Sequence, residues 1–172
     1  MEAEFRELDK DDAESLIALR LSVMKTNPYS FTISENEEKR TTKENIQRAI
    51  DSYASSSEKI MIGAFNGSLI GAIGIERSYH EYERHKAMLW GPYVQEPNRG
   101  KGIGNSLVKK ALDFAFTIGD VNMVTVETAS KSSEAIHLFK KNGFTESGRQ
   151  NNALLINGDY LDLLYMQHRK SI

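Results

Sequence analysis

The segment 99–105 contains three alternating glycines and is the part of the sequence best suited to chemistry. It follows an apolar run that ends at Val94 and leads directly into an amphipathic run typical of a helix. Glycines at this spacing let successive backbone N–H groups point into one concavity, and the start of a helix adds further free N–H groups. Arg99 and Lys101 supply positive charge at the rim. The segment is therefore suited to hold a phosphate or pyrophosphate, or it is a tight turn between a strand and a helix.

The glycine spacing does not fit two familiar nucleotide-binding loops. A Walker A loop needs Gly-x-x-x-x-Gly-Lys-Ser/Thr, which does not occur in the sequence. A Rossmann fingerprint needs a third glycine where Leu107 stands, and the strands that precede the segment have the wrong order for that fold. A module that binds ATP or NAD through this turn is therefore the least favoured interpretation.

Hydrophobic periodicity predicts the elements that position this turn. Strands are predicted over residues 3–8, 60–65, 68–76, 88–94 and 121–128, with two more from Phe144 onward around Asn157-Gly158. Helices are predicted from Asp9 to about Met24, from a capping-box pattern at 41–44 to about Tyr53, after the glycine turn, and from Ser132 or Ser133 to Asn142-Gly143. Residues 25–40 are predicted to be a loop. The order βααβββαβαββ predicts a mixed α/β fold, with a single central mixed sheet of about six to seven strands flanked by about four helices.

Composition restricts the class of protein. The 172 residues are 40% hydrophobic, which is enough for one core, so we expect a single domain over residues 1–172. The 22 basic and 24 acidic side chains are nearly balanced, which argues against a nucleic-acid partner. The absence of cysteine excludes disulfides, thiolate metal sites and cysteine nucleophiles. An N-terminus charged from Glu2 onward and the lack of a long apolar stretch predict no export signal, no membrane partner and a cytoplasmic location.

Charge is distributed unevenly along the chain. Residues 1–98 carry 12 basic and 17 acidic side chains, whereas residues 99–172 carry 10 basic and 7 acidic side chains. The difference is either ordinary surface variation or a sign that the second half of the chain receives an anion. His80 and His85 lie five positions apart, so they do not share a helix face as metal ligands would, and we expect no metal.

Two segments in the expected order resemble the GCN5-related N-acetyltransferase (GNAT) superfamily. The segment Arg99–Gly104, between a strand and a helix, resembles the acetyl-CoA-binding motif of that family. The segment 126–144 is similar to a second motif, in which a strand is followed by Asn-x-x-Ala-x-x-Leu-Tyr-x-x-x-Gly-Phe. Residues 5–21 also resemble the first strand and helix of the family. The resemblance implies the GNAT fold and an acetyl-CoA-dependent N-acetyltransferase that works by direct attack in a ternary complex, without a metal.

The resemblance also implies which residues contact acetyl-CoA. Backbone N–H groups of the glycine turn would hold the pyrophosphate, and Val94 would pair with the pantetheine arm. Ser132 stands where the family has an asparagine that touches CoA. The full implied set lies on the fourth strand, the glycine turn and the following short helix: Tyr93, Val94, Gln95, Arg99, Gly100, Lys101, Gly102, Ile103, Gly104, Asn105, Ser132 and Phe139.

Phe139 departs from the family pattern in a way that affects catalysis. Many relatives have a tyrosine at this position, which protonates the departing thiolate, and phenylalanine cannot donate a proton. A thiol has a pKa of about 8.5, so the reaction can proceed without this acid at a reduced rate. Tyr93, Tyr160 or Tyr165 could take its place. The substitution also leaves open that the chain is a CoA-binding sensor or regulatory domain.

The sequence leaves alternatives open for the general base and for the acceptor site. Glu127 matches a strand glutamate that serves as base in some relatives, but it could also point to solvent, with Glu76 or water as the alternative base. In this family the loop that contains Tyr29 and Phe31 forms one wall of the acceptor pocket, opposite the turn at 151–158, although ordinary loop packing would explain these residues equally well. We expect a small-molecule or peptide amine as acceptor, and a monomer or homodimer.

Overall fold

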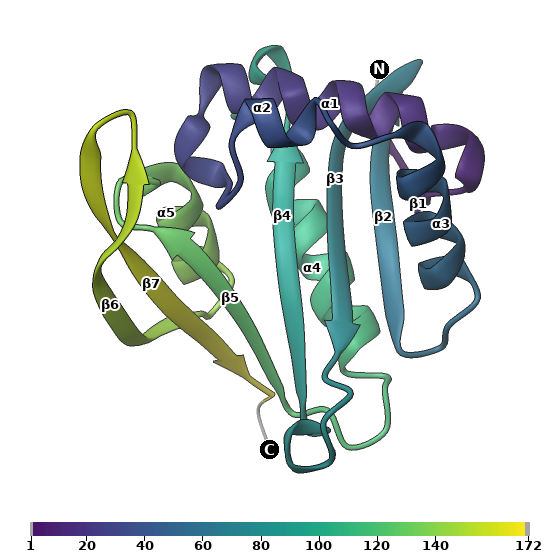
Figure 1. The fold of residues 1–172 in the computed structure, drawn as a ribbon. Helices are drawn as coiled ribbons and strands as arrows, with labels where there is room; N and C mark the ends of the chain where they lie inside the picture. The colour runs from purple at the N-terminus through teal and green to yellow at the C-terminus, as the bar shows by residue number, and fades with distance from the viewer. Residues whose placement is uncertain (1, 171–172) are drawn as a thin grey trace.

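A seven-stranded sheet is the central feature of the computed structural model, which describes residues 2–170 (Figure 1). The strands lie in the order β1-β2-β3-β4-β5-β7-β6, and all neighbours are antiparallel except β4 and β5. This arrangement confirms the predicted mixed α/β fold. The strands are β1 (Glu4–Glu7), β2 (Lys59–Asn66), β3 (Ser68–Arg77), β4 (Lys86–Val94), β5 (Met123–Ala129), β6 (Thr145–Ile156) and β7 (Asp159–Arg169). The α-helices are α1 (Ala13–Thr26), α2 (Glu35–Glu38), α3 (Lys43–Ala54), α4 (Ile103–Ala115) and α5 (Ser133–Lys141).

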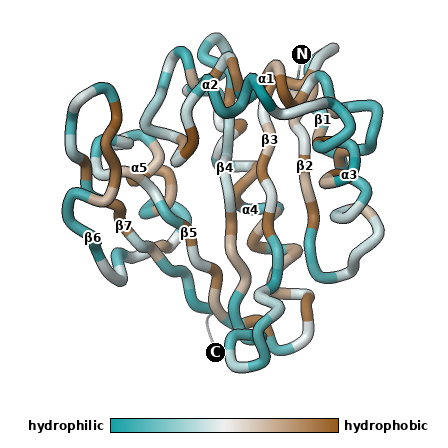
Figure 2. Tube along the Cα trace, viewed as in Figure 1, coloured by the Kyte–Doolittle hydropathy of each residue, from teal (hydrophilic) through white to brown (hydrophobic). Residues whose placement is uncertain are grey.

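Helices cover both faces of the sheet. In β3, Ile73 and Ile75 belong to a core that also contains residues of α4, whereas Leu69 and Ala72 belong to a second core with residues of α1 and α3. Because strand side chains alternate between faces, β3 supplies both cores. Figure 1 shows α4 behind the central strands and α1 crossing the upper end of the sheet. Hydrophobic residues follow the central strands, whereas the loop between β3 and β4 at the lower end of the sheet is mostly hydrophilic (Figure 2).

The parallel strands β4 and β5 pair over only three positions. Lys86–Met88 pairs with Met123–Thr125, and no pair joins the two strands beyond these residues. Figure 1 shows the strands diverging toward the end of the sheet that α1 and α2 cover. Within β4 the register against β3 also shifts between Trp90 and Tyr93. The sheet therefore opens next to the C-terminal half of β4.

The segment predicted to be a loop, residues 25–40, contains a short helix, so residues 2–170 form five α-helices where about four were predicted. The helix is α2, and its N-cap is Ser34, whose hydroxyl accepts a hydrogen bond from the Glu37 backbone N–H while the Glu37 side chain accepts one from the Ser34 N–H. This capping box was missed because α2 has only four residues and no apolar periodicity. Among residues 2–170, no helix has the length and apolar character needed to cross a membrane.

Two predicted helix starts differ in detail. Asp9 caps a 3₁₀ turn (Lys10–Asp12) that continues into α1, so the helical region begins where it was predicted. The cap of α3 is Thr42, whose hydroxyl accepts from the Asn45 N–H at 3.2 Å. The predicted box from Thr41 to Glu44 is wrong by one residue.

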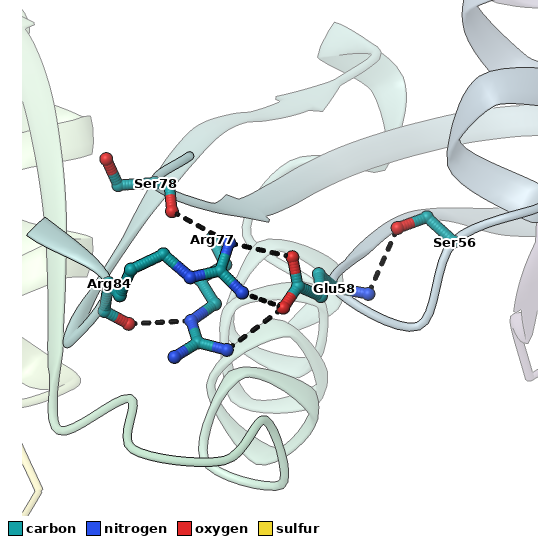
Figure 3. Close-up of polar contacts among 5 residues, drawn as sticks. All are labelled: Ser56, Glu58, Arg77, Ser78 and Arg84. Carbon is teal, nitrogen blue, oxygen red and sulfur yellow. Dashed lines mark hydrogen bonds and ion pairs between the residues drawn. The ribbon is translucent and has the colours of Figure 1, made fainter. Parts of the chain in front are cut away.

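A carboxylate between two arginines fixes the loop that joins β3 to β4 (Figure 3). Glu58 accepts hydrogen bonds from Arg84 Nη1 at 3.0 Å and from Arg77 Nη1 at 2.9 Å, and Arg84 Nη2 also contacts it. Arg77 Nε donates to the Arg84 carbonyl at 2.6 Å, and Arg84 Nη1 to the Ser78 carbonyl at 3.4 Å. The Glu58 N–H donates to Ser56 Oγ at 3.1 Å. The cluster lies at the end of the sheet where β4 and β5 are still paired.

Candidate active site

The glycine turn has the backbone shape that an anion site requires. Gly100 and Gly102 have φ of +73° and +82°, a region that residues with a side chain rarely adopt, and a Cβ at either position would meet only open space. Gly102 is the N-cap of α4, so the first N–H groups of that helix have no partner within it. Gly100, Gly102 and the first residues of α4 line one cavity, where these groups and the positive end of the helix dipole favour an anion.

A cavity of about 440 Å³ lies between the glycine turn, β4 and α5. It contains seven of the residues expected to contact acetyl-CoA: Val94, Arg99, Gly100, Gly102, Ile103, Gly104 and Asn105. Gly104 lets α4 lie close to α5, because a Cβ there would come within 3.2 Å of Leu138 Cδ2. The Asn105 side chain accepts a hydrogen bond from Asn142 Nδ2 at 3.1 Å. Residues of α5 complete the wall: Glu134, Ala135, His137, Leu138 and Lys141.

Arg99 is held in place by the protein. Its Nε donates to the Val94 carbonyl at 3.0 Å and its Nη2 donates to Thr26 Oγ1 at 2.8 Å. The side chain therefore joins the glycine turn to the end of β4 and to the last residue of α1. It contributes positive charge to the cavity from a fixed position.

Five residues expected to contact acetyl-CoA lie outside this cavity, and two of them, Tyr93 and Phe139, line a third cavity described below. Ser132 is buried and its hydroxyl donates to the Tyr29 carbonyl at 2.7 Å. The Gln95 N–H donates to the Ile70 carbonyl at 3.0 Å. Lys101 lines a neighbouring cavity of about 420 Å³, on the side of the glycine turn that faces the N-terminal strand.

A third cavity, of about 300 Å³, lies where β4 and β5 diverge. It shares Ser30, Pro92 and Ala135 with the cavity beside the glycine turn, so the two meet between the strands. We call it the inner cavity, and its lining comes from α1, the segment 30–33, β4, β5 and α5: Arg20, Ser30, Phe31, Thr32, Ile33, Met88, Leu89, Trp90, Gly91, Pro92, Tyr93, Glu127, Thr128, Ala135 and Phe139.

Aromatic side chains form much of the inner cavity. The Phe31 and Tyr93 rings stack with centroids 4.4 Å apart, and the Trp90 and Tyr93 ring centroids are 5.7 Å apart. Trp90 Nε1 donates to the Tyr53 hydroxyl at 3.1 Å, and burial raises the pKa of Tyr53 to about 12. Of the two residues expected to bind acceptor, Phe31 lines the cavity, whereas Tyr29 contributes its carbonyl to Ser132 and does not line it.

The inner cavity contains one carboxylate, that of Glu127. Glu127 lies on β5, exposed and opposite Tyr165 of β7, so it lines the cavity and reaches solvent at the same time. Glu76, the alternative base, lies on β3 opposite Met88, and its charge acts on the Tyr53 hydroxyl. Glu76 does not line the cavity.

One of the three candidate tyrosines shares the inner cavity with Phe139. Phe139 is 1% exposed and packs 5.4 Å from Phe144, and Tyr93 lines the same cavity. The Tyr165 hydroxyl donates to Gln150 Oε1 at 3.2 Å, and Tyr160 is 67% exposed on the terminal hairpin. Burial raises the pKa of Tyr93, so its hydroxyl keeps its proton at neutral pH.

An ion pair beside the inner cavity was missed by the sequence analysis. Arg20 lines the cavity, and its partner Glu38 is 1% exposed. The two residues are 18 positions apart, on α1 and on a helix that was predicted to be a loop, so no local pattern indicated the pair. Among residues 2–170, no group of three His, Asp or Glu side chains is placed to bind a metal ion.

Sequence comparison identifies the family. Residues 19–144 match the profile described as the acetyltransferase (GNAT) family, so the chain belongs to that family. It is 30% identical over 82 residues to spermidine N(1)-acetyltransferase of Vibrio cholerae and 24% identical over 110 residues to that of Escherichia coli. The alignments cover 48% and 64% of this chain, and the chain covers 47% and 58% of the length of these two curated relatives. It is also 23% identical over 112 residues to an L-amino acid N-acetyltransferase of Escherichia coli, covering 65% of this chain and 68% of that protein.

Solved structures show the same fold. A GNAT-family acetyltransferase from Streptococcus pneumoniae superposes with a TM-score of 0.89 at 23% identity, over 99% of this chain and 100% of that one. A phosphinothricin acetyltransferase from Sinorhizobium meliloti, solved in complex with acetyl-CoA, superposes with a TM-score of 0.85 at 18% identity, over 99% of this chain and 90% of that one. These likenesses confirm the GNAT fold predicted from the two motifs.

Proposed function

We propose that residues 1–172 form a single GNAT domain that transfers an acetyl group from acetyl-CoA to an amine. The observation that supports this most directly is the meeting of two cavities between β4 and β5. One is lined by the glycine turn and suits an anionic cofactor arm, and the other contains aromatic walls and a carboxylate. Their junction at Pro92 and Ala135 is where a thioester and an amine would meet.

The residues of this chain fit acetyl-CoA as a substrate. The N–H groups at the start of α4 and the fixed guanidinium of Arg99 would hold its pyrophosphate. The glycines at 100 and 102 leave open space where side chains would block that group. Val94 lines the same cavity, on the part of β4 that has no ladder pairs with β5, where an amide-containing arm would find backbone partners.

In this reaction the amine attacks the thioester directly, so the protein has to supply proton transfers and no covalent nucleophile. An alkylamine has a pKa of about 10.4 and must lose a proton before its nitrogen attacks the thioester carbon. Glu127 would take that proton, directly or through water, as the C–N bond forms and the C–S bond breaks. The thiolate leaves and is protonated by Tyr93 or by water. Phe139 would still fill the space beside the thioester, although it donates no proton.

The acceptor is proposed to be a small-molecule or peptide amine. The curated relatives are named for small amines, spermidine and L-amino acids, which supports an acceptor of that size. A sensor that only binds CoA was suggested by Phe139 alone, and the inner cavity with its carboxylate favours an enzyme. A cytoplasmic location and a monomer or homodimer remain predictions from the sequence.

The proposal is tested with ligands and amines. Acetyl-CoA and CoA should raise the melting temperature, whereas ATP and NAD should not. With acetyl-CoA present, a panel of amines should then release free thiol, detected with a chromogenic disulfide reagent. Stabilisation by ATP or NAD instead of acetyl-CoA would contradict the assignment of the glycine turn, and tight CoA binding with no acceptor in the panel would favour the sensor.

A further inference from the structure

The Arg20–Glu38 pair places a positive charge at the inner cavity while its negative partner is enclosed. Arg20 lines the cavity and its side chain is 20% exposed, whereas the Glu38 side chain is 1% exposed and does not line it. Arg20 Nη2 donates to Glu38 Oε2 at 2.9 Å, and Nε lies 2.8 Å from Oε1. The Nε–Oε1 approach is not aligned as a hydrogen bond, so this contact is mainly electrostatic. The pair therefore presents its cationic end to the cavity.

This pairing uses one edge of the guanidinium and leaves the other edge open. Arginine has five N–H donors arranged so that its side edge (Nε and Nη2) and its end (Nη1 and Nη2) can each meet a carboxylate. Glu38 occupies the side edge. No acceptor among residues 2–170 is hydrogen-bonded to Nη1, and Nη1 is not among the buried atoms that lack a partner, so it is accessible. The end of the guanidinium thus has free donors.

Aromatic rings hold the guanidinium in this position. The Arg20 Cζ atom lies 5.8 Å from the Phe31 ring and 5.7 Å from the Tyr93 ring, which stack on each other. Glu38 fixes the charged group through its carboxylate, and the stacked rings lie together beside it. An arginine fixed in this way loses little conformational freedom when it binds an anion, which favours specific recognition.

The opposite charge in the lining comes from a different element. Glu127 is on β5, whereas Arg20 is on α1, so the cavity has one acidic and one basic lining side chain with aromatic and aliphatic residues between them. A polyamine would meet a fixed cation in this cavity and only one carboxylate. A small molecule with an amine at one end and a carboxylate near it would match both charges.

We propose that Arg20, buttressed by Glu38, binds a carboxylate of the acceptor, so that the acceptor is a small zwitterion such as an α-amino acid. This inference rests on the proposed N-acetyltransferase function. The carboxylate would receive N–H donors from the end of the Arg20 guanidinium, and the amine would lie toward Glu127. Ile33 and Met88, which are partly exposed in the cavity lining, would contact an apolar side chain of such an acceptor.

Four acceptors test the carboxylate directly: leucine, leucinamide, 3-methylbutylamine and 1,5-diaminopentane. The first three share one side chain and differ in the group beside the amine, and the fourth represents a polyamine. With kcat/KM expressed per free amine, leucine should exceed leucinamide and 3-methylbutylamine by roughly 10- to 100-fold, because a charge-assisted bidentate contact is lost. Leucine should also exceed the diamine.

Two Arg20 variants separate recognition from folding. Arg20→Lys keeps the charge beside Glu38 but removes the Nη1 and Nη2 donors at the end of the guanidinium. The preference for leucine over leucinamide should therefore fall by at least about tenfold, while the KM for acetyl-CoA changes little. The double variant Arg20→Met/Glu38→Leu removes both charges together, which avoids leaving a buried carboxylate unpaired. It should fold and lose the preference as well. Arg6→Lys is the matched control, because Arg6 makes a bidentate pair with Asp12 away from the cavity and should leave the preference unchanged.

The possible failures are distinguishable. Equal or faster acetylation of leucinamide or the diamine by the wild-type protein would overturn the carboxylate proposal and leave the N-acetyltransferase standing. An unchanged preference in a folded Arg20→Lys protein would overturn the role of Arg20. Binding of acetyl-CoA with no acetylation of any of the four amines would overturn the proposed function, and this inference with it.

Discussion

The Ser132 hydroxyl donates a 2.7 Å hydrogen bond to the carbonyl of Tyr29, 103 positions earlier in the chain. This contact joins the start of α5 to the segment that forms a wall of the inner cavity. The family resemblance implies a contact between Ser132 and CoA, and in the structure the hydroxyl donates to the Tyr29 carbonyl. Ser132 therefore helps to hold the segment whose residues Ser30 and Phe31 line the inner cavity.

Replacing Ser132 tests which partner matters. Ser132→Ala removes the donor of this part-buried hydrogen bond, which should destabilise the fold by about 0.5–1.5 kcal/mol. The Kd for acetyl-CoA should stay within about twofold, because the hydroxyl lies outside the cavity beside the glycine turn. Chemical denaturation and isothermal titration calorimetry measure the two quantities. A large loss of acetyl-CoA affinity at unchanged stability would restore the role implied by the family.

Acetyl-CoA binding should depend on the open space at Gly102. Gly102→Val places a branched side chain where the structure has nothing within 4 Å, at φ of +82°, and should weaken acetyl-CoA binding by at least about tenfold. Gly158→Val is the matched control, because Gly158 also has positive φ and open space but lies in the turn between β6 and β7. The control should share the backbone strain without the binding defect. Unchanged affinity in a folded Gly102→Val protein would contradict the site.

Glu127 should influence the pH dependence of the reaction. Among residues 2–170, Glu127 is the one carboxylate that lines the inner cavity, so Glu127→Gln should lower kcat at pH 7 by roughly 10²-fold, and the rate should recover as the pH rises and free amine becomes abundant. Glu76→Gln is the comparison, since Glu76 does not line that cavity and should leave the profile unchanged. Initial rates from pH 6 to pH 10 give both profiles. If only Glu76→Gln changes the profile, Glu76 is the base.

A hydroxyl at position 93 and a hydroxyl at position 139 should each be able to protonate the departing thiolate. Tyr93→Phe keeps the stack on Phe31 but removes the hydroxyl, and should lower kcat by at least about tenfold. Phe139→Tyr adds a hydroxyl from another side of the same cavity, and should leave acetyl-CoA affinity nearly unchanged while restoring kcat in the Tyr93→Phe background. Pre-steady-state thiol release is the measurement, because product release can hide a change in the chemical step. A wild-type rate in Tyr93→Phe would assign the proton to water.

Glu58 should stabilise the fold in a pH-dependent way. Hydrogen bonds from Arg84, and then from Arg77, hold the pKa of Glu58 below its ordinary value. Such a group stabilises the fold above its unfolded pKa and loses this effect as the pH falls through its folded pKa. Glu58→Gln should therefore lower the Tm at pH 7, and the difference from wild type should narrow below about pH 4.

The control for this experiment is Glu146→Gln. Glu146 pairs with Arg149 at the surface, at 3.2 Å, without a second arginine. Surface ion pairs of this kind contribute little to the free energy of unfolding, so the Tm of the control should change much less. A Tm difference for Glu58→Gln that stays constant from pH 7 to pH 3 would show that its charge is not responsible.

The sequence predicted the parts of the fold that depend on local patterns. The strand pair joined by Asn66-Gly67 and the glycine turn before α4 were predicted because positive φ and alternating apolar residues leave clear signals. Glu127 was singled out because it matches a strand glutamate that serves as base in some relatives, and it lines the inner cavity.

Features that depend on contacts between distant residues were not predictable in the same way. Nothing near Arg20 or Glu38 shows that they pair, because the contact exists only once α2 folds against α1. Likewise, no local signal shows that the Ser132 hydroxyl bonds to the Tyr29 carbonyl. Periodicity gives the elements, and the side-chain partners come from how those elements pack.

The short pairing between β4 and β5 gives this sheet an exposed strand edge in its middle. Edges normally lie at the rims of sheets, where they can recruit strands of other chains and start aggregation. Here the edge of β4 beyond Met88 is flanked by β5, α5 and the segment before α2, and cavities of about 440 and 300 Å³ lie beside it. The unpaired backbone groups of β4 therefore lie inside the molecule and not at its rim, where another chain would add a strand.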